Sequence, residues 1–248
     1  MKARLYKLGG RALEDPELLA GLARELQGAP RSVVVHGGGS RVTDLLERLG
    51  IESRFVDGRR ATSPEAMAIV EMVLSGSMNK HLVARLNGFG VRAVGVSGRD
   101  GGMIRARLKP GLGCVGTPEA IDTALIETAW AAGWLPVVSP VSSGPDTRAV
   151  NVNADEAALG LARALEVSSL VYLSDVDGVQ LDGELARELD AASAESAIAA
   201  GAIHGGMKLK VDVALAAAAA GIEEVIVAGA ARLRGGFQGT RILKGDRP

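Results

Sequence analysis

Short runs of β-branched and aliphatic residues alternate with stretches of helical spacing along this chain. The expected strands are residues 4–7, 32–36, 93–97, 135–139, 169–173 and 224–228. Several of these runs are apolar throughout, as is typical of central strands that are buried on both faces of a parallel sheet. The β-α-β-α order predicts an α/β fold, a three-layer αβα sandwich with a central, mainly parallel sheet and two lobes.

The intervening helices have recognisable starts. The dipeptides Asp15-Pro16 and Ser63-Pro64 each place a capping side chain before a proline at the first helical position. Residues 154–165 and 207–220 are rich in Ala and Leu at helical spacing, which predicts two further helices.

Three segments interrupt this alternation. Residues 54–60 and 98–117 are bounded by glycine and are expected to form hairpins or a lid. Residues 142–148 read Ser-Ser-Gly-Pro-Asp-Thr-Arg, a loop rich in turn residues that suits a lobe boundary. The expected lobes are therefore residues 1–150 and residues 151–248.

Composition argues against several classes of protein. The 28 basic and 29 acidic residues leave a formal net charge of −1, so neither nucleic acid nor a membrane is an expected partner. The longest apolar tract, around residues 213–220, is too short to span a bilayer. Cys114 is the single cysteine, so we expect no disulfide. Because residues 1–7 enter a strand directly, no targeting peptide is expected and the predicted location is the cytoplasm.

Glycine with polar neighbours follows four of the six expected strands. These segments are residues 7–10, 36–40, 97–102 and 174–178. Ligands of parallel sheets bind beyond the carboxyl ends of the strands, and a tight turn needs only a single glycine. The run Gly37-Gly38-Gly39 precedes a helix expected near Ser40, where free N–H groups can meet an anion. These strand ends therefore predict a site for phosphate or carboxylate groups.

Familiar catalytic motifs are absent or out of context. The chain contains no G-x-x-x-x-G-K-[ST] motif, which excludes a P-loop enzyme. Residues 111–116 match G-x-G-x-x-G but follow a proline rather than a strand, which favours a loop. His36, His81 and His204 lack metal-ligand spacing, and we expect each in a loop or on the surface. Residues 175–178 begin like a calcium loop without its later ligands.

Phosphoryl transfer without a P-loop lysine remains compatible with these features. It requires positive charge on the moving group, Mg²⁺ across the nucleotide phosphates and an acceptor held in line. Lys7 ends the first strand beside Gly9-Gly10, and Lys210 follows Gly205-Gly206 near the start of a helix. A solvated surface lysine is the ordinary alternative for each, but these positions favour a functional role. Lys208 is expected on the surface.

Seven segments recur here in the order seen in the amino-acid kinase family. They are residues 7–10, 36–39, 57–62, 97–102, 151–155, 173–178 and 205–210. The chain resembles this family over nearly its whole length, most strongly those members that act on N-acetyl-L-glutamate. The resemblance implies transfer of the γ-phosphate of ATP, which carries Mg²⁺, to the side-chain carboxylate of that substrate in arginine biosynthesis.

The resemblance also implies which residues handle the phosphoryl group. Lys7 and Lys210 would stabilise it during transfer, and Asp155 would hold the two lysines in place. A carboxylate between two ammonium groups stays ionised, which agrees with this role. The residues expected to bind ATP are Gly9, Gly10, Ser174, Asp175, Val176, Asp177, Gly178, Val179, Gly206 and Met207.

A second group of residues is expected to bind the acceptor. Arg60 would clamp its α-carboxylate in a two-pronged ion pair, and Asn151 would hydrogen-bond it. The N–H groups of Gly38 and Gly39 would orient the acceptor carboxylate or the γ-phosphate. Arg59 stands where the family usually has an apolar residue, so a clamp by Arg59 is the alternative. Arginine-inhibited members carry an extra N-terminal helix that this chain lacks, so the resemblance implies an arginine-insensitive homodimer.

Three other functions stay open from the sequence. A kinase of lysine biosynthesis acts on aminoadipate linked to an acidic carrier protein, and it should show a basic patch near its site. A nicotinamide-dependent dehydrogenase would use residues 111–116, which lack the required strand and helix. A non-catalytic sensor should have lost Lys7, Asp155 or Lys210, and all three are present. The run at residues 151–155 favours the enzymes that act on N-acetyl-L-glutamate over the carrier-dependent ones.

Overall fold

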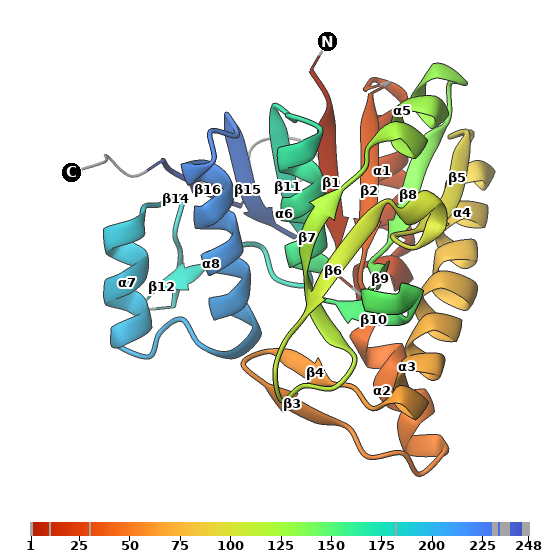
Figure 1. Cartoon of the computed structure of the whole chain (residues 1–248). Helices are drawn as coiled ribbons and strands as arrows, with labels where there is room; N and C mark the ends of the chain where they lie inside the picture. Colours follow the sequence, from red (N-terminus) through yellow and green to blue (C-terminus); the bar gives the residue numbers. More distant parts are fainter. Residues whose placement is uncertain are drawn as a thin grey trace.

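The computed structural model describes residues 2–9, 11–29, 31–181, 183–229, 233 and 239–244. A central sheet lies between two layers of helices (Figure 1). Its eight strands are, in spatial order, β14 (Glu188–Leu189), β16 (Thr240–Ile242), β15 (Glu224–Ala228), β11 (Ser169–Leu173), β1 (Arg4–Leu8), β2 (Ser32–His36), β8 (Leu135–Ser139) and β5 (Ala93–Ser97). Strands from β15 to β5 pair in parallel, whereas β16 runs antiparallel to β15. All six expected strands are present, and the predicted α/β fold is confirmed.

Helices cover both faces of this sheet. One face packs against α1 (Pro16–Gln27), α2 (Gly39–Arg48), α3 (Pro64–Glu71), the π-helical segment η2 (Met72–Met78) and α4 (Asn79–Gly88). The other packs against α5 (Ala124–Ala131), α6 (Ala154–Ala164), α7 (Ala191–Ala199) and α8 (Gly205–Ala219). Short 3₁₀ turns are η1 (Arg11–Glu14), η3 (Asp100–Gly102) and η4 (Pro145–Thr147). Asp15 and Ser63 cap α1 and α3 by accepting backbone N–H groups, as predicted.

The segments expected as hairpins form smaller sheets. β3 (Arg54–Val56) and β4 (Arg59–Ala61) pair through a two-residue turn, Asp57-Gly58, in which both residues have positive φ. β6 (Ile104–Leu108) and β7 (Val115–Ile121) form a second hairpin, which closes into a small barrel with β9 (Val141–Ser143) and β10 (Ala149–Val152). β12 (Gln180–Leu181) pairs with β13 (Glu184–Leu185). The hairpin predictions are confirmed, whereas the barrel was not predicted.

The order of strands brings three glycine-bearing ends together. β1 lies between β2 and β11, with Lys7 opposite Val35 on one side and Tyr172 on the other. Beyond the strands, the N–H of Gly37 donates to the Leu8 carbonyl at 2.8 Å. The carboxyl ends of β1, β2 and β11 therefore lie side by side along one edge of the sheet, where Lys7 projects from β1.

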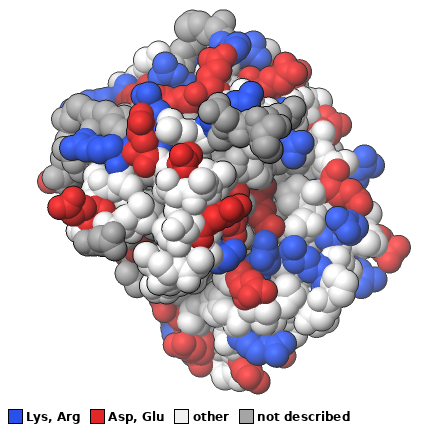
Figure 2. All heavy atoms as spheres, turned by 90° about the vertical axis from the view of Figure 1, so that its left-hand side faces the viewer, with Lys and Arg blue, Asp and Glu red and all other residues white. Residues whose placement is uncertain are grey.

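Charge is distributed over the surface without one prevailing sign on the face seen in Figure 2. Acidic and basic side chains are interspersed there, and the formal net charge is −1. Among the residues described, no helix has the length and apolar character needed to cross a membrane.

Candidate active site

Three charged side chains from three elements meet beyond the end of β1. The Lys7 Nζ lies 2.6 Å from Asp155 Oδ1, and the Lys210 Nζ lies 3.5 Å from both Asp155 oxygens. All three residues are buried. Asn153 caps α6 by accepting the N–H of Asp155 at 2.8 Å, which fixes that residue in the first turn of the helix. The structure thus assembles the lysine–aspartate–lysine group from β1, α6 and α8.

The electrostatics of this cluster follow from its burial and its charge balance. Burial alone would raise the pKa of Asp155, but the charges of Lys7 and Lys210 outweigh it and hold that pKa below its ordinary value. Burial, aided by repulsion from Lys7, lowers the pKa of Lys210 to about 8. Asp155 is therefore ionised at neutral pH, and Lys210 can lose its proton in the mildly alkaline range.

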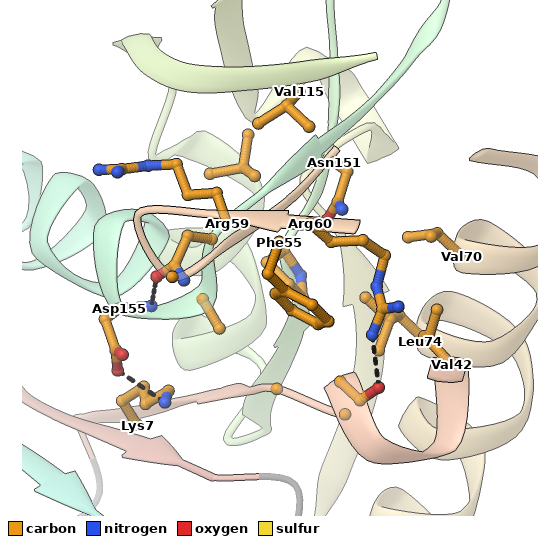
Figure 3. A pocket seen from close by; sticks show the side chains of 18 residues that line it. Lys7, Val42, Phe55, Arg59, Arg60, Val70, Leu74, Val115, Asn151 and Asp155 are labelled. Carbon is orange, nitrogen blue, oxygen red and sulfur yellow. Dashed lines mark hydrogen bonds and ion pairs between the residues drawn. The ribbon is translucent and has the colours of Figure 1, made fainter. Parts of the chain in front are cut away.

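Lys7 and Asp155 form one wall of a cavity of about 210 Å³. Figure 3 shows Arg60 and Asn151 on the same cavity, with Phe55 between them and the two charged residues. The other residues that line it are Gly37, Gly38, Gly39, Val42, Gly58, Arg59, Val70, Leu74, Val115, Pro140, Val152, Asn153 and Ala154. The cavity therefore joins all four residues expected at the acceptor to two of the three charged residues.

Arg60 is a buried cation without a carboxylate partner among the described residues. Its guanidinium donates to the Gly39 carbonyl at 2.8 Å and to Thr43 Oγ1 at 2.7 Å, and it also contacts Ser53 Oγ. The Phe55 ring covers it, with the ring centroid 4.6 Å from Cζ. These neutral acceptors hold the side chain in place, and the charge of Glu47 acts on it without forming an ion pair, so the site favours an anion.

The glycine turn and Asn151 complete this cavity. Gly38 precedes α2 without a side-chain cap, and a Cβ there would collide with Met78 Sδ. A Cβ at Gly39 would meet nothing within 4 Å, so the start of α2 is open. Asn151 Nδ2 donates to Thr62 Oγ1 at 3.0 Å. The amide oxygen of Asn151 can therefore accept a hydrogen bond from another donor.

Arg59 also lines the cavity, but unlike Arg60 it is paired with a carboxylate. Its guanidinium donates to both carboxylate oxygens of Glu156, at 2.8 and 3.2 Å. The two arginine side chains point in opposite directions, as expected for neighbours on a strand (Figure 3). Because Glu156 already satisfies Arg59, the geometry favours Arg60 over Arg59 as the acceptor clamp.

The residues expected at ATP lie along the ends of β1 and β11 and at the start of α8. Ser174 is buried at the end of β11, whereas Asp175, Val176 and Asp177 are exposed beside it. At the α8 start, His204 makes no side-chain cap, and a Cβ at Gly205 or Gly206 would meet nothing within 4 Å. This open helix N-terminus, close to Lys210, suits a phosphate group.

Other members of this expected ATP set have different surroundings. Gly9 donates its N–H to the Leu173 carbonyl, and Met207 is partly buried against the core. A Cβ at Gly178 would press on Leu185 and Thr240. Gly10 lies outside the described residues.

Val179, also expected at ATP, packs its side chain into the core, and its role in nucleotide binding stays a prediction. Val179 is fully buried in the core, its N–H donates to Thr240 Oγ1, and its carbonyl accepts from Ala186. The chain folds back onto the sheet here, so this residue has a packing role.

The family model for the amino acid kinase family matches residues 2–229. The chain belongs to the amino acid kinase family. It is 42% identical to an acetylglutamate kinase of Chloroflexus aurantiacus, over 98% of this chain and 97% of that protein. It is 41% identical to an acetylglutamate kinase of Rubrobacter xylanophilus, again over 98% and 97%. The crystal structure of smu.665 from Streptococcus mutans UA159 is similar, with a TM-score of 0.89, 25% identity, and 98% and 99% of the two chains covered. The protein is thus a phosphotransferase.

One expectation about this amino acid kinase is wrong. His36 is fully buried at the end of β2, not in a loop or on the surface, whereas His81 and His204 are exposed. Burial lowers the pKa of His36 to about 4, so its ring is neutral. Its Nδ1 donates to the Gly37 carbonyl at 2.9 Å, and its Nε2 accepts from Asn79 at 3.1 Å. His36 therefore stabilises the glycine turn through its hydrogen bond to Gly37.

Sequence reasoning also missed the residues that hold Arg60 and Asn151. Thr43, Ser53 and Thr62 are separated in sequence, and only the tertiary contacts of Arg60 and Asn151 bring them to this cavity. No short motif marks them. Thr62 alone had a signal, because it ends the segment of residues 57–62 that resembles the family.

Proposed function

We propose that this amino acid kinase is an acetylglutamate kinase, which transfers the γ-phosphate of ATP to the side-chain carboxylate of N-acetyl-L-glutamate. The product is an acyl phosphate, and the reaction belongs to arginine biosynthesis. The observation that carries the proposal is the buried Arg60, which has no described carboxylate partner and faces the cavity that Lys7 and Asp155 also line. A dicarboxylate can neutralise Arg60 with one group and present the other to the charged cluster. The names of the relatives support the same substrate.

In the proposed reaction, an acceptor carboxylate oxygen attacks the γ-phosphorus, and the bond from that phosphorus to the bridging oxygen of ADP breaks. Lys7 and Lys210 place positive charge on the moving group, where charge develops. Asp155 keeps both ammonium groups fixed and balances their charge. N–H groups at Gly38 and Gly39 orient the acceptor carboxylate, and the Asn151 side chain binds the remainder of the substrate.

The nucleotide is assigned to the ends of β1 and β11 and the start of α8. We propose that Gly9, Ser174, Asp175 and Gly206 lie against it, with Mg²⁺ carried by its phosphates. Such an ion would offset part of the phosphate charge. Among the described residues, no three His, Cys, Asp or Glu side chains cluster as a metal site. Residues 1–150 would then serve mainly the acceptor and residues 151–248 mainly ATP.

A homodimer is also proposed, and the edge of the sheet supports it. β5 pairs only with β8 among the described strands. Beside it lies an apolar groove of about 240 Å³, lined by Val94, Val96, Leu125 and Trp134 among others. An edge strand next to an apolar groove is a surface that a second copy can cover.

The decisive experiment traps the acyl phosphate with hydroxylamine. The enzyme is incubated with ATP, Mg²⁺ and, separately, N-acetyl-L-glutamate, glutamate, aspartate and UMP. We expect hydroxamate chiefly from N-acetyl-L-glutamate. Its absence with that substrate, in an enzyme shown to be folded, would overturn the assignment. Turnover only with carrier-linked aminoadipate would establish the lysine-pathway alternative.

Arg60→Lys tests the acceptor clamp. A lysine keeps the charge but loses the two-pronged geometry, so we expect KM for N-acetyl-L-glutamate to rise by roughly 10- to 100-fold, with KM for ATP little changed. Initial rates measured by ADP release, with each substrate varied in turn, provide the check. A change confined to KM for ATP would contradict the clamp.

A further inference from the structure

A partly buried ion pair ties the β3–β4 hairpin to helix α6. The side chains of Arg59 and Glu156 are 17% and 12% exposed, and two hydrogen bonds join them. The hydrogen bonds to Glu156 also raise the pKa of Arg59. A charge-assisted, two-pronged pair shielded from solvent is stronger and more directional than an exposed one.

The neighbours of this pair in the sequence belong to the two parts of the proposed site. Arg60, the acceptor clamp, follows Arg59 on β4, and Asp155 precedes Glu156 in the first turn of α6. Since the pair fixes Arg59 to Glu156, it also fixes the distance between the strand that carries the clamp and the helix that carries Asp155. No other ion pair among the described residues joins these two elements.

Apart from this ion pair, the hairpin is joined to the body of the protein chiefly through Arg60, which donates to Gly39 and Thr43 of α2. β3 and β4 pair only with each other among the described strands, and an isolated bridge from Thr62 to Gly113 follows them. At the tip, a Cβ at Gly58 would lie 3.4 Å from the Leu209 side chain of α8, so the turn rests on that helix. Such a small unit depends on each remaining contact for its position.

We propose that the Arg59–Glu156 ion pair is a positioning device for the acceptor site. It holds the hairpin closed on α6 and so presents Arg60 at a fixed distance from the Lys7–Asp155–Lys210 cluster. The identity of the acceptor in this proposal rests on the function proposed above. The contact between the hairpin and α6 does not depend on that function. An acceptor that meets a pre-formed clamp avoids the ordering cost of hairpin closure, so the pair lowers KM for the acceptor rather than for ATP.

A double-mutant cycle tests this inference. Arg59→Met keeps the aliphatic stem, Glu156→Gln keeps the shape, and the third variant carries both changes. We expect each single variant to raise KM for N-acetyl-L-glutamate by roughly ten-fold, the scale of one charge-assisted pair, with KM for ATP unchanged. The double variant should be no worse than either single variant, because the pair is already broken in each.

Arg107→Met is the matched control. It removes an arginine from another hairpin ion pair, with Glu119, but both side chains are more than half exposed and lie outside the cavity. We expect wild-type kinetics from it. The positioning role would be overturned if the rise in KM of the double variant equalled the product of the two single rises. It would also be overturned if Glu156→Gln left KM for N-acetyl-L-glutamate unchanged. An effect of Arg59→Met alone would instead make Arg59 a direct substrate ligand.

Amide hydrogen exchange separates this inference from the substrate assignment. In the protein without substrates, we expect residues 54–61 to exchange roughly ten-fold faster in both single variants than in wild type, with the central strands unchanged. That result would hold even if N-acetyl-L-glutamate proved not to be the acceptor. If the exchange rates of the hairpin amides were unchanged, the ion pair would not be what holds the hairpin on α6, whatever the substrate.

Discussion

Replacement of Lys210 by Met is expected to lower kcat by roughly 10²- to 10³-fold with little change in KM for ATP, the scale for losing one group that stabilises a transition state. Methionine fills the space of the buried stem and removes only the charge. Asp155 keeps Lys7 as a partner at 2.6 Å, so the rest of the cluster stays neutralised. Lys7→Met should show a loss of the same order. Steady-state kinetics with both substrates varied measure the effect.

Lys208→Met is the control for this prediction. Lys208 lies on the same helix, but it is exposed and paired with Asp212, so its removal should leave kcat unchanged. A wild-type kcat in Lys210→Met would remove Lys210 from the mechanism.

The pH profile gives an independent readout for Lys210. Its pKa of about 8 means that its charge is lost as the pH rises through that value, so kcat/KM should fall on the alkaline side. In Lys210→Arg, the guanidinium stays charged and that fall should shift to higher pH.

Asp155→Asn is expected to reduce the free energy of unfolding by about 3–5 kcal/mol at neutral pH, the scale for removing one partner of a buried ion pair. Two ammonium groups would then face each other in a buried site with nothing to neutralise them. Activity should fall with stability, because the lysines lose their fixed positions. Urea unfolding monitored by circular dichroism measures the first effect, and ADP release measures the second.

The pH dependence of this loss has a definite sign. Without Asp155, the pKa of Lys210 falls further below its value in the unfolded chain, so folding expels a proton at neutral pH. The loss relative to wild type is therefore largest from about pH 4, the ordinary pKa of aspartate, up to neutral pH. It shrinks in acid, because wild type then loses the Asp155 charge too, and it shrinks toward about pH 10, where the unfolded lysine also loses its proton. Asp212→Asn, at an exposed pair, should cost less than about 1 kcal/mol. A similarly small loss for Asp155→Asn would contradict the burial of two charged lysines.

The sheet could be predicted because its strands are buried on both faces. Such strands are mostly apolar, and the runs at residues 32–36 and 169–173 have apolar centres that can be recognised without any long-range information. Lys7 could likewise be singled out as a candidate site residue, because a charged residue that ends an apolar strand beside glycines has few structural reasons to be there. Helix caps at Asp15 and Ser63 were equally local signals.

Features that depend on contacts distant in sequence were not predictable in this way. Arg59 and Arg60 are adjacent and chemically identical, and only Glu156, far along the chain, separates their environments. His36 looked like a loop residue because its partner, Asn79, is contributed by α4. The barrel of β6, β7, β9 and β10 was not predicted, because its strands are short and only partly apolar.

The two apolar cores on either face of the sheet have a consequence for how the molecule unfolds. One core joins Leu5 with Val225, and the other joins Val34 with Ile226, so each contains residues from both halves of the chain. Neither half can lose its structure and leave the other with an intact core. The proposed division of labour between acceptor and nucleotide therefore does not make two independent folding units, and we expect the described strands to unfold as a single cooperative unit.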